Sequence, residues 1–187
     1  MNSYALFASI NFTFFENLKV QPGTRFTYNN VYGSVISPAI NLKYQINENN
    51  QLLASYAKGY RAPSLNQLYL DFAVGPFLIL GNENLEAENS HNITIASNHL
   101  FNFNDQELNI EPSLFYNDID NLITLSPIEN FTRHYINIDI NKTRGGNIKI
   151  TYKPMENLQF IGGASILSKY NSFTEEFDTD DFIVTNR

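Results

Sequence analysis

The sequence predicts an all-β protein, an antiparallel up-and-down meander of about eight long strands that forms a segment of a transmembrane β-barrel. Three observations indicate this fold: long stretches of alternating apolar and polar residues, connections that alternate between short and long, and aromatic residues grouped near strand ends. Successive side chains of a strand point to opposite faces, so alternation gives one apolar and one polar face. About eleven residues, tilted by about 45°, span the apolar thickness of a bilayer.

The first four predicted strands follow this alternation closely. They are residues 4–15, 18–28, 36–46 and 52–60. In the second of them, Leu18, Val20 and Phe26 lie on one face, and Lys19 and Arg25 lie on the other. The third has the same pattern, and in the fourth Ala54, Tyr56 and Lys58 are in step with Leu52.

The last four predicted strands are residues 90–103, 108–125, 141–153 and 158–167. The first of these keeps an apolar face although Ser97 and His99 interrupt it, and the alternation is weakest in the last. Three strands contain an internal proline, namely Pro22, Pro38 and Pro112. Proline has no N–H group to donate to a neighbouring strand, so we expect these residues at bulges or strand ends.

The predicted connections alternate in length along the chain. Short connections at 16–17, 47–50, 104–106 and 154–157 are rich in residues typical of hairpin turns. Longer connections are predicted at 29–35, 61–89, 126–140 and from 171 onward. Short periplasmic turns and long external loops produce this order in outer-membrane barrels.

Aromatic residues of the apolar parity gather at the two ends of the predicted strands. The group near the short turns is Phe12, Phe14, Tyr44, Phe101, Phe103, Tyr152 and Phe160. The group near the long connections is Tyr4, Tyr28, Tyr60 and Tyr116. Aromatic rings favour the headgroup level of a bilayer, so two such groups are typical of a membrane-spanning barrel wall.

Composition narrows the possible functions. The chain has 187 residues, of which 17% are charged, and its net charge of −7 argues against a nucleic-acid partner. It has no cysteine, which excludes disulfides and thiolate metal sites. Residues 1–6 do not resemble a signal peptide, so we expect the natural N-terminus of such a protein to lie elsewhere. No residue pattern indicates catalysis, a metal site or a cofactor.

Two other folds remain open from the pattern alone. One is a soluble β-sandwich, such as a carbohydrate-binding module, whose strands would be shorter and whose loops would not alternate in length. The other is a small closed eight-stranded outer-membrane pore.

Three sequence boxes resemble those of TonB-dependent outer-membrane receptors. Residues 53–69 contain a Tyr-Arg-Ala-Pro box, formed after Gly59 by Tyr60, Arg61, Ala62 and Pro63. Residues 81–90 resemble a second box of that family, with Gly81, Asn82, Leu85 and Glu88 at matching positions, and Asn84 is a further residue of this motif. Two prolines of that box are replaced here, by Glu83 and Ala87. Residues 114–123 match a third stretch.

The resemblance implies an outer-membrane location and a receptor for uptake of a scarce nutrient, such as a ferric siderophore, haem, cobalamin or a glycan. Such receptors have a 22-stranded barrel around an N-terminal plug, and TonB drives release. Neither a plug nor an aromatic C-terminal residue is recognisable here, so we expect residues 1–187 to be a partial barrel domain. The implied partners are outer-membrane lipid, the remainder of the barrel and plug, the TonB complex and a small-molecule ligand.

The long connection 61–89 is the predicted ligand-binding segment. Arg61, Asn66, Tyr69 and Asp71 are the candidate ligand contacts, and the alternative is that they only anchor the loop. Haem receptors of the family often carry a histidine between the first two boxes, and this chain has none there. His91 and His99 lie about 26 Å apart on an extended strand, too far to share one metal ion.

Overall fold

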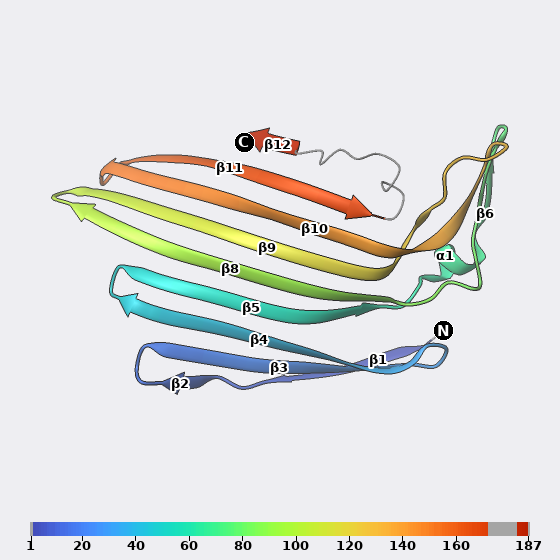
Figure 1. Cartoon of the computed structure of the whole chain (residues 1–187), viewed down its shortest axis with the longest axis horizontal. Helices are drawn as coiled ribbons and strands as arrows, with labels where there is room; N and C mark the ends of the chain where they lie inside the picture. Colours follow the sequence, from blue (N-terminus) through green and yellow to red (C-terminus); the bar gives the residue numbers. More distant parts are fainter. Residues whose placement is uncertain (1, 172–182, 187) are drawn as a thin grey trace.

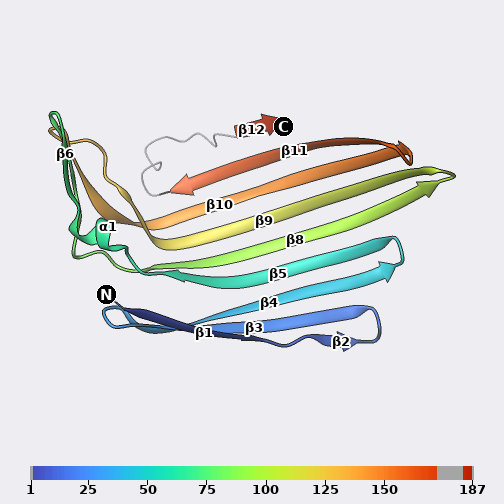
Figure 2. The same cartoon turned by 180° about the vertical axis from the view of Figure 1, so that it is seen from behind.

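The computed structural model describes residues 2–171 and 183–186, and most of them lie in β-strands (Figures 1 and 2). The main strands are β1 (Ser3–Ser9), β2 (Phe12–Phe14), β3 (Leu18–Asn29), β4 (Gly33–Asn47), β5 (Asn50–Arg61), β8 (Glu88–Phe103), β9 (Gln106–Leu125), β10 (Thr132–Met155), β11 (Leu158–Asn171) and β12 (Ile183–Asn186). Between β5 and β8 lie helix α1 (Leu65–Tyr69) and the short strands β6 (Asp71–Val74) and β7 (Phe77–Leu80). No described helix is long and apolar enough to cross a bilayer.

The sheet is an antiparallel meander, which confirms the predicted fold class. Its strand order is β1-β3-β4-β5-β8-β9-β10-β11-β12, and β2 continues the line of β1 along β3. The short turns gather at one end of the sheet and the long β5–β8 connection stands at the other, which we call the loop end (Figure 1). Strands β9 and β10 are 20 and 24 residues long, well above the length common in soluble sheets.

The three internal prolines each lie where one ladder of backbone hydrogen bonds is interrupted. Opposite Pro22, the line of β1 and β2 breaks at residues 10–11. Pro38 lies where the pairing of β4 with β5 ends, and Pro112 lies in a gap of the β8–β9 pairing. Each proline keeps its other neighbour, at Ile40, Thr24 and Ile148 respectively. Each strand therefore accommodates its proline by losing backbone pairing with one of its two neighbouring strands, and no bulge forms at the proline.

Two predicted loops are shorter than expected. Residues 29–35 were expected to form a loop, but Asn29 pairs with Gly33 and only 30–32 connect β3 to β4. The Asn29 side-chain oxygen accepts hydrogen bonds from the backbone N–H groups of Val31 and Tyr32, which closes this turn. The predicted loop 126–140 is also wrong beyond residue 131, because β10 begins at Thr132 and pairs there with β7.

The sheet has one apolar face and one polar face, as the alternation predicts. Side by side on the apolar face lie Ala54, Ile95, Leu114, Gly146 and Ile166, one from each of five neighbouring strands. The opposite, polar face carries ion pairs that link β9 to β10. These are Lys149 with Glu111 at 2.9 Å and Lys153 with Glu107 at 2.8 Å.

The apolar face is not covered by a second protein layer in the described part of the chain. Ile95 is 57% exposed and Leu114 is 67% exposed. The buried aliphatic residues of the described part are Leu68, Leu85, Ile123 and Ile138. Three of these four form a small cluster at the loop end rather than a core beneath the sheet.

Candidate functional site

Residues 62–87, which we call the rim loop, connect β5 to β8 at the loop end of the sheet (Figure 1). The loop opens with α1, which Ser64 caps. The Ser64 hydroxyl accepts a hydrogen bond from the Gln67 backbone N–H at 3.3 Å, and the Ser64 N–H donates to the Gln67 side chain at 2.9 Å. This reciprocal capping box fixes the direction in which the chain leaves β5.

Strands β6 and β7 form a hairpin that stands away from the main sheet (Figures 1 and 2). Gly75 in its turn has a φ of 59°, a conformation that glycine adopts without strain. Strand β7 also runs parallel to the start of β10, and the Phe77 and Phe131 rings meet edge to face at 5.5 Å. The hairpin is thereby joined to the connection between β9 and β10.

An ion pair between Arg61 and Glu88 ties the two ends of the rim loop together, and we call it the anchor. Arg61 is the last residue of β5 and pairs with Glu88, the first residue of β8. The guanidinium binds both carboxylate oxygens, with the Nε–Oε2 bond at 2.5 Å, and also donates to Gln67 Oε1 at 3.2 Å. Glu88 accepts a further bond from the Ile123 backbone N–H at 2.8 Å. One carboxylate therefore joins β5, β8 and β9.

Gly81 and Asn82 hold the far end of the rim loop against α1. The Gly81 N–H donates to the Leu70 carbonyl at 2.6 Å, and the Asn82 N–H donates to the Gln67 carbonyl at 2.9 Å. The Asn82 side chain donates to the Tyr135 carbonyl at 3.0 Å and accepts from the Asn84 N–H at 2.9 Å. A Cβ atom on Gly81 would lie 2.5 Å from the Leu68 carbonyl oxygen, so only glycine fits there.

The small core beneath the rim loop consists of Leu68, Leu85 and Ile123, with Tyr135 packed against it. Pro63 is also fully buried. The Tyr32 hydroxyl donates to the Leu85 carbonyl at 3.1 Å, which links the β3–β4 turn to this small core. Burial, reinforced by the neighbouring Tyr69 and Tyr60, raises the pKa of Tyr32 above its ordinary value.

A second polar network fixes the end of the rim loop to β9 and β10. The Glu86 N–H donates to the Asn137 side chain at 2.9 Å, and Asn137 donates to the carbonyls of Glu86 and Asn121. The Asn121 side chain in turn donates to Glu86 Oε2 at 2.8 Å. Asn121 has a φ of 56° within β9, a conformation that asparagine tolerates better than most residues.

The structure brings the residues of the first two sequence boxes into contact. Arg61 meets Glu88, and Leu85 lies in the core over which α1 packs. Gly59 lies against Ser90, whose hydroxyl oxygen would be 2.3 Å from a Cβ atom at position 59. Most of the residues singled out in these boxes therefore make contacts that hold the rim loop in its conformation.

Three of the four predicted ligand contacts lie on the exposed side of the rim loop. Asn66 and Asp71 are exposed, and Tyr69 is 60% exposed. The fourth, Arg61, is engaged in the anchor although its side chain remains 47% exposed. Their contact with a ligand stays a prediction. Sequence reasoning missed Gln67, although Ser-x-x-Gln at 64–67 is itself a capping signal.

The rim loop carries Asp71, Glu83 and Glu86 and no basic residue. Across the part of the chain that the structure describes, no three His, Asp or Glu side chains come close enough to hold a metal ion. The loop therefore offers hydroxyl, amide, carboxylate and aromatic groups to a ligand.

A protein-family model described as TonB dependent receptor-like, beta-barrel, matches residues 1–187. The ferric enterobactin receptor of Pseudomonas aeruginosa is 30% identical over 139 residues, which are 67% of this chain and 18% of that receptor. The ferrienterobactin receptor of Escherichia coli K12 is 30% identical over 104 residues, 50% of this chain and 14% of that receptor. The chain thus spans less than a fifth of either relative.

A solved structure shares the fold. The crystal structure of the siderophore receptor PirA from Pseudomonas aeruginosa superimposes with a TM-score of 0.74 at 21% identity. The match covers 89% of this chain and 32% of PirA. The described sheet therefore corresponds to about a third of a larger receptor chain.

Proposed function

Because the chain belongs to the TonB-dependent receptor β-barrel family, we propose that it forms part of the barrel wall of an outer-membrane receptor for a ferric siderophore. The observation that carries this proposal is the family match over residues 1–187 together with the two boxes that meet at the anchor. The family consists of transport receptors rather than enzymes. Both curated relatives are ferric enterobactin receptors, which favours an iron chelate as the ligand.

The uncovered apolar face supports contact with outer-membrane lipid. The short turns would lie on the periplasmic side, and the rim loop would lie outside, where a ligand arrives. The polar face would line the lumen and meet the plug. Uptake would require the remainder of the barrel and the TonB complex as partners.

The rival folds have less support. A soluble sandwich would cover the apolar face with a second sheet, whereas the described strands leave large residues such as Leu114 exposed on it. A closed eight-stranded pore would pair its first and last strands. Within the described residues, β1 and β12 lie at opposite edges of the sheet and do not pair.

We propose that Tyr69, with Asn66 and Asp71, contacts the siderophore, and that Arg61 contributes from the rim. The exposure of the first three supports this role. A tyrosine ring offers a large, rigid contact area, a property of residues that dominate binding energy.

Replacing Tyr69 with alanine in the full-length receptor should weaken ferric-siderophore binding by about tenfold, the cost of losing one aromatic contact. Binding and uptake of radioactive iron as its enterobactin complex measure this effect. The matched control is Tyr28→Ala, which removes an exposed tyrosine of the apolar face and should leave binding unchanged. Equal affinity in Tyr69→Ala and the unaltered receptor would reject Tyr69 as a ligand contact.

A further inference from the structure

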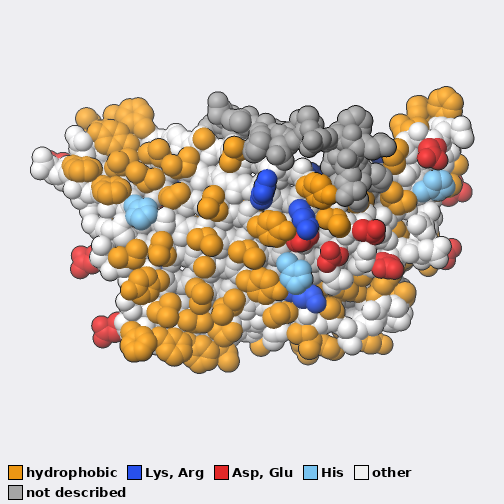
Figure 3. Space-filling model, in the orientation of Figure 1, with side chains coloured by type: hydrophobic (Ala, Val, Ile, Leu, Met, Phe, Trp, Pro, Cys, Tyr) orange, Lys and Arg blue, Asp and Glu red, His pale blue; other side chains and the backbone are white. Residues whose placement is uncertain are grey.

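A cluster of charged side chains interrupts the apolar face near the loop end. Lys58, His91, Asp118 and Lys142 lie side by side in one row across β5, β8, β9 and β10. The next row toward the short turns contains Tyr56, Ile93, Tyr116, Arg144 and Ser168. Figure 3 shows lysine and arginine side chains together on this face, beyond the mainly hydrophobic surface nearer the short turns.

The position of these rows matches the headgroup level of a bilayer. Rows on one face of a strand are about 7 Å apart, and the row that follows Arg144 is the apolar one of Ile95 and Leu114. From that row, the apolar face continues to the aromatic residues at the short turns. Toward the loop end, by contrast, the row of Ile95 and Leu114 is followed by the row that contains Tyr56, Tyr116 and Arg144. The row of Lys58, Asp118 and Lys142 comes next. This order of apolar, aromatic and charged residues is typical of a membrane interface.

The charges of the cluster are only partly balanced. Lys142 lies 3.8 Å from Asp118, and Tyr116 donates a hydrogen bond to the same carboxylate at 3.2 Å. Asp120, one row further out, adds a second carboxylate. Within the described residues, neither Arg144 nor Lys58 has a carboxylate within ion-pair distance. Arg144 is exposed, and no described carboxylate competes with an anion for its guanidinium.

A hollow beside this cluster continues into an apolar groove. The hollow measures about 320 Å³ and is lined by Tyr116, Lys142, Arg144, Ser168 and Tyr170. It shares Arg144 and Ser168 with a second hollow of about 340 Å³, which also includes Leu114, Gly146 and Ile166.

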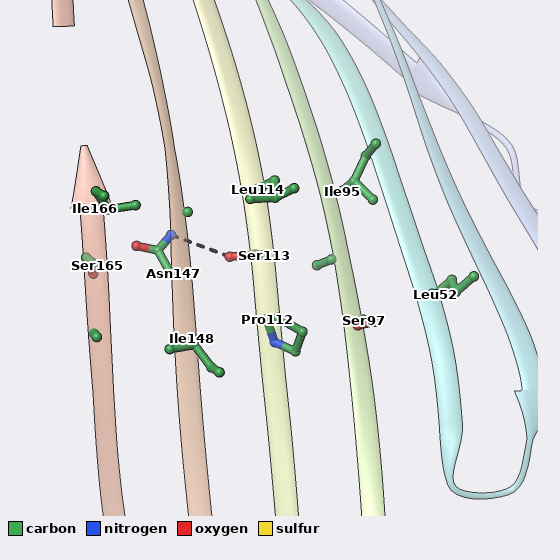
Figure 4. A pocket seen from close by; sticks show the side chains of 13 residues that line it. Leu52, Ile95, Ser97, Pro112, Ser113, Leu114, Asn147, Ile148, Ser165 and Ile166 are labelled. Atoms are coloured by element: carbon green, nitrogen blue, oxygen red, sulfur yellow. Dashed lines mark hydrogen bonds between the residues drawn. The ribbon is translucent and has the colours of Figure 1, made fainter. Parts of the chain in front are cut away.

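The second hollow in turn opens into a groove of about 570 Å³, with which it shares Leu114, Gly146 and Ile166. Figure 4 shows Leu114 of β9 and Ile166 of β11 on either side of β10 in this groove. Gly146 and Ala164 keep it open, because each presents little or no side chain between larger neighbours.

We propose that these connected hollows bind one lipid of the outer leaflet, a lipid that carries phosphate on its headgroup. The phosphate would lie between Lys142 and Arg144, and an acyl chain would follow the groove over Gly146. Charge complementarity selects the phosphate, and the groove selects the chain. This inference rests on the proposed outer-membrane location and is independent of which siderophore the receptor takes up.

Titration of the full-length receptor in detergent with purified lipid A, the diphosphorylated and acylated anchor of lipopolysaccharide, tests the proposal by native mass spectrometry. The double variant Lys142→Gln and Arg144→Gln should weaken binding by about 30-fold, because each basic residue near a lipid headgroup contributes about fivefold. Gly146→Leu should also weaken it, since a larger side chain would fill the groove. The matched control is Lys149→Gln with Lys153→Gln, which removes two lysines of β10 from the polar face.

Three results would overturn the proposal: equal affinity in the Lys142/Arg144 variant, equal loss in the control variant, or full competition by millimolar inorganic phosphate, which would indicate a simple anion pocket. Lipid A stripped of its phosphates should bind the unaltered receptor as weakly as intact lipid A binds the double variant. Siderophore binding by the same variants separates the two proposals. Lost lipid binding with normal siderophore binding supports the lipid site, and a failure of siderophore binding in the unaltered receptor contradicts only the proposed function.

Discussion

Replacing Glu88 with alanine should release the rim loop from the end of the sheet. The carboxylate is nearly buried, with 11% of its side chain exposed, and it accepts bonds from Arg61 and from the Ile123 N–H. Its loss leaves that buried N–H without a partner. Because Arg61 is half exposed, water compensates part of the lost ion pair, so we expect a cost of about 2–4 kcal/mol.

Amide hydrogen exchange of the full-length receptor measures this effect. Peptides from 62–87 should exchange about 30- to 1000-fold faster in Glu88→Ala, while peptides from the middle of β9 should not change. The matched control is Glu83→Ala, because Glu83 is an exposed acid of the same loop with no bonded partner in the described structure. Unchanged exchange in Glu88→Ala would show that the anchor does not hold the loop.

Replacing Gly81 with alanine should have a comparable effect through a different cause. The new Cβ atom would lie 2.5 Å from the Leu68 carbonyl oxygen and 2.6 Å from the Leu70 backbone nitrogen. Both are backbone atoms, so neither can rotate away, and the contact between the loop and α1 must open. Overpacking of this kind costs about 1–3 kcal/mol, to which the loss of the Gly81–Leu70 hydrogen bond adds.

The readout for Gly81→Ala is limited proteolysis of the rim loop together with siderophore binding. We expect faster cleavage within 62–87 and weaker binding. Gly162→Ala serves as the control, because a Cβ atom there meets no atom within 4 Å. Cleavage at the same rate in both variants would contradict the tight packing of Gly81.

The long strands could be predicted because their signal is local. In β3, the alternation of Leu18, Val20 and Phe26 with polar residues depends only on the strand's own geometry and on the apolar and polar environments at its two faces. The start of β10 was missed although Ile136, Ile138 and Ile140 alternate there, because the Asn and Asp residues between them read as a loop. That segment is a strand because β7 and β9 pair with it on both sides.

The rim loop could be predicted only in part. The two boxes contain both members of the Arg61–Glu88 ion pair, but they do not contain the groups of β9 and β10 that hold Glu88 and Asn82. The Ile123 N–H and the Tyr135 carbonyl lie far away in sequence and reach the loop only after the sheet has formed. The β6–β7 hairpin gave no alternating signal, since Phe77–Leu80 is a continuous apolar run.

Solvent accessibility along β9 tests most directly whether lipid covers the apolar face. The chain has no cysteine, so single cysteines can carry nitroxide labels at 110, 111, 113 and 114 in the full-length receptor within a bilayer. Labels at 110 and 114 should be relaxed by oxygen, which concentrates in hydrocarbon, and those at 111 and 113 by a water-soluble nickel complex. Labels at 110 and 114 that are shielded from both reagents would show a protein layer over this face and would contradict a membrane-spanning wall.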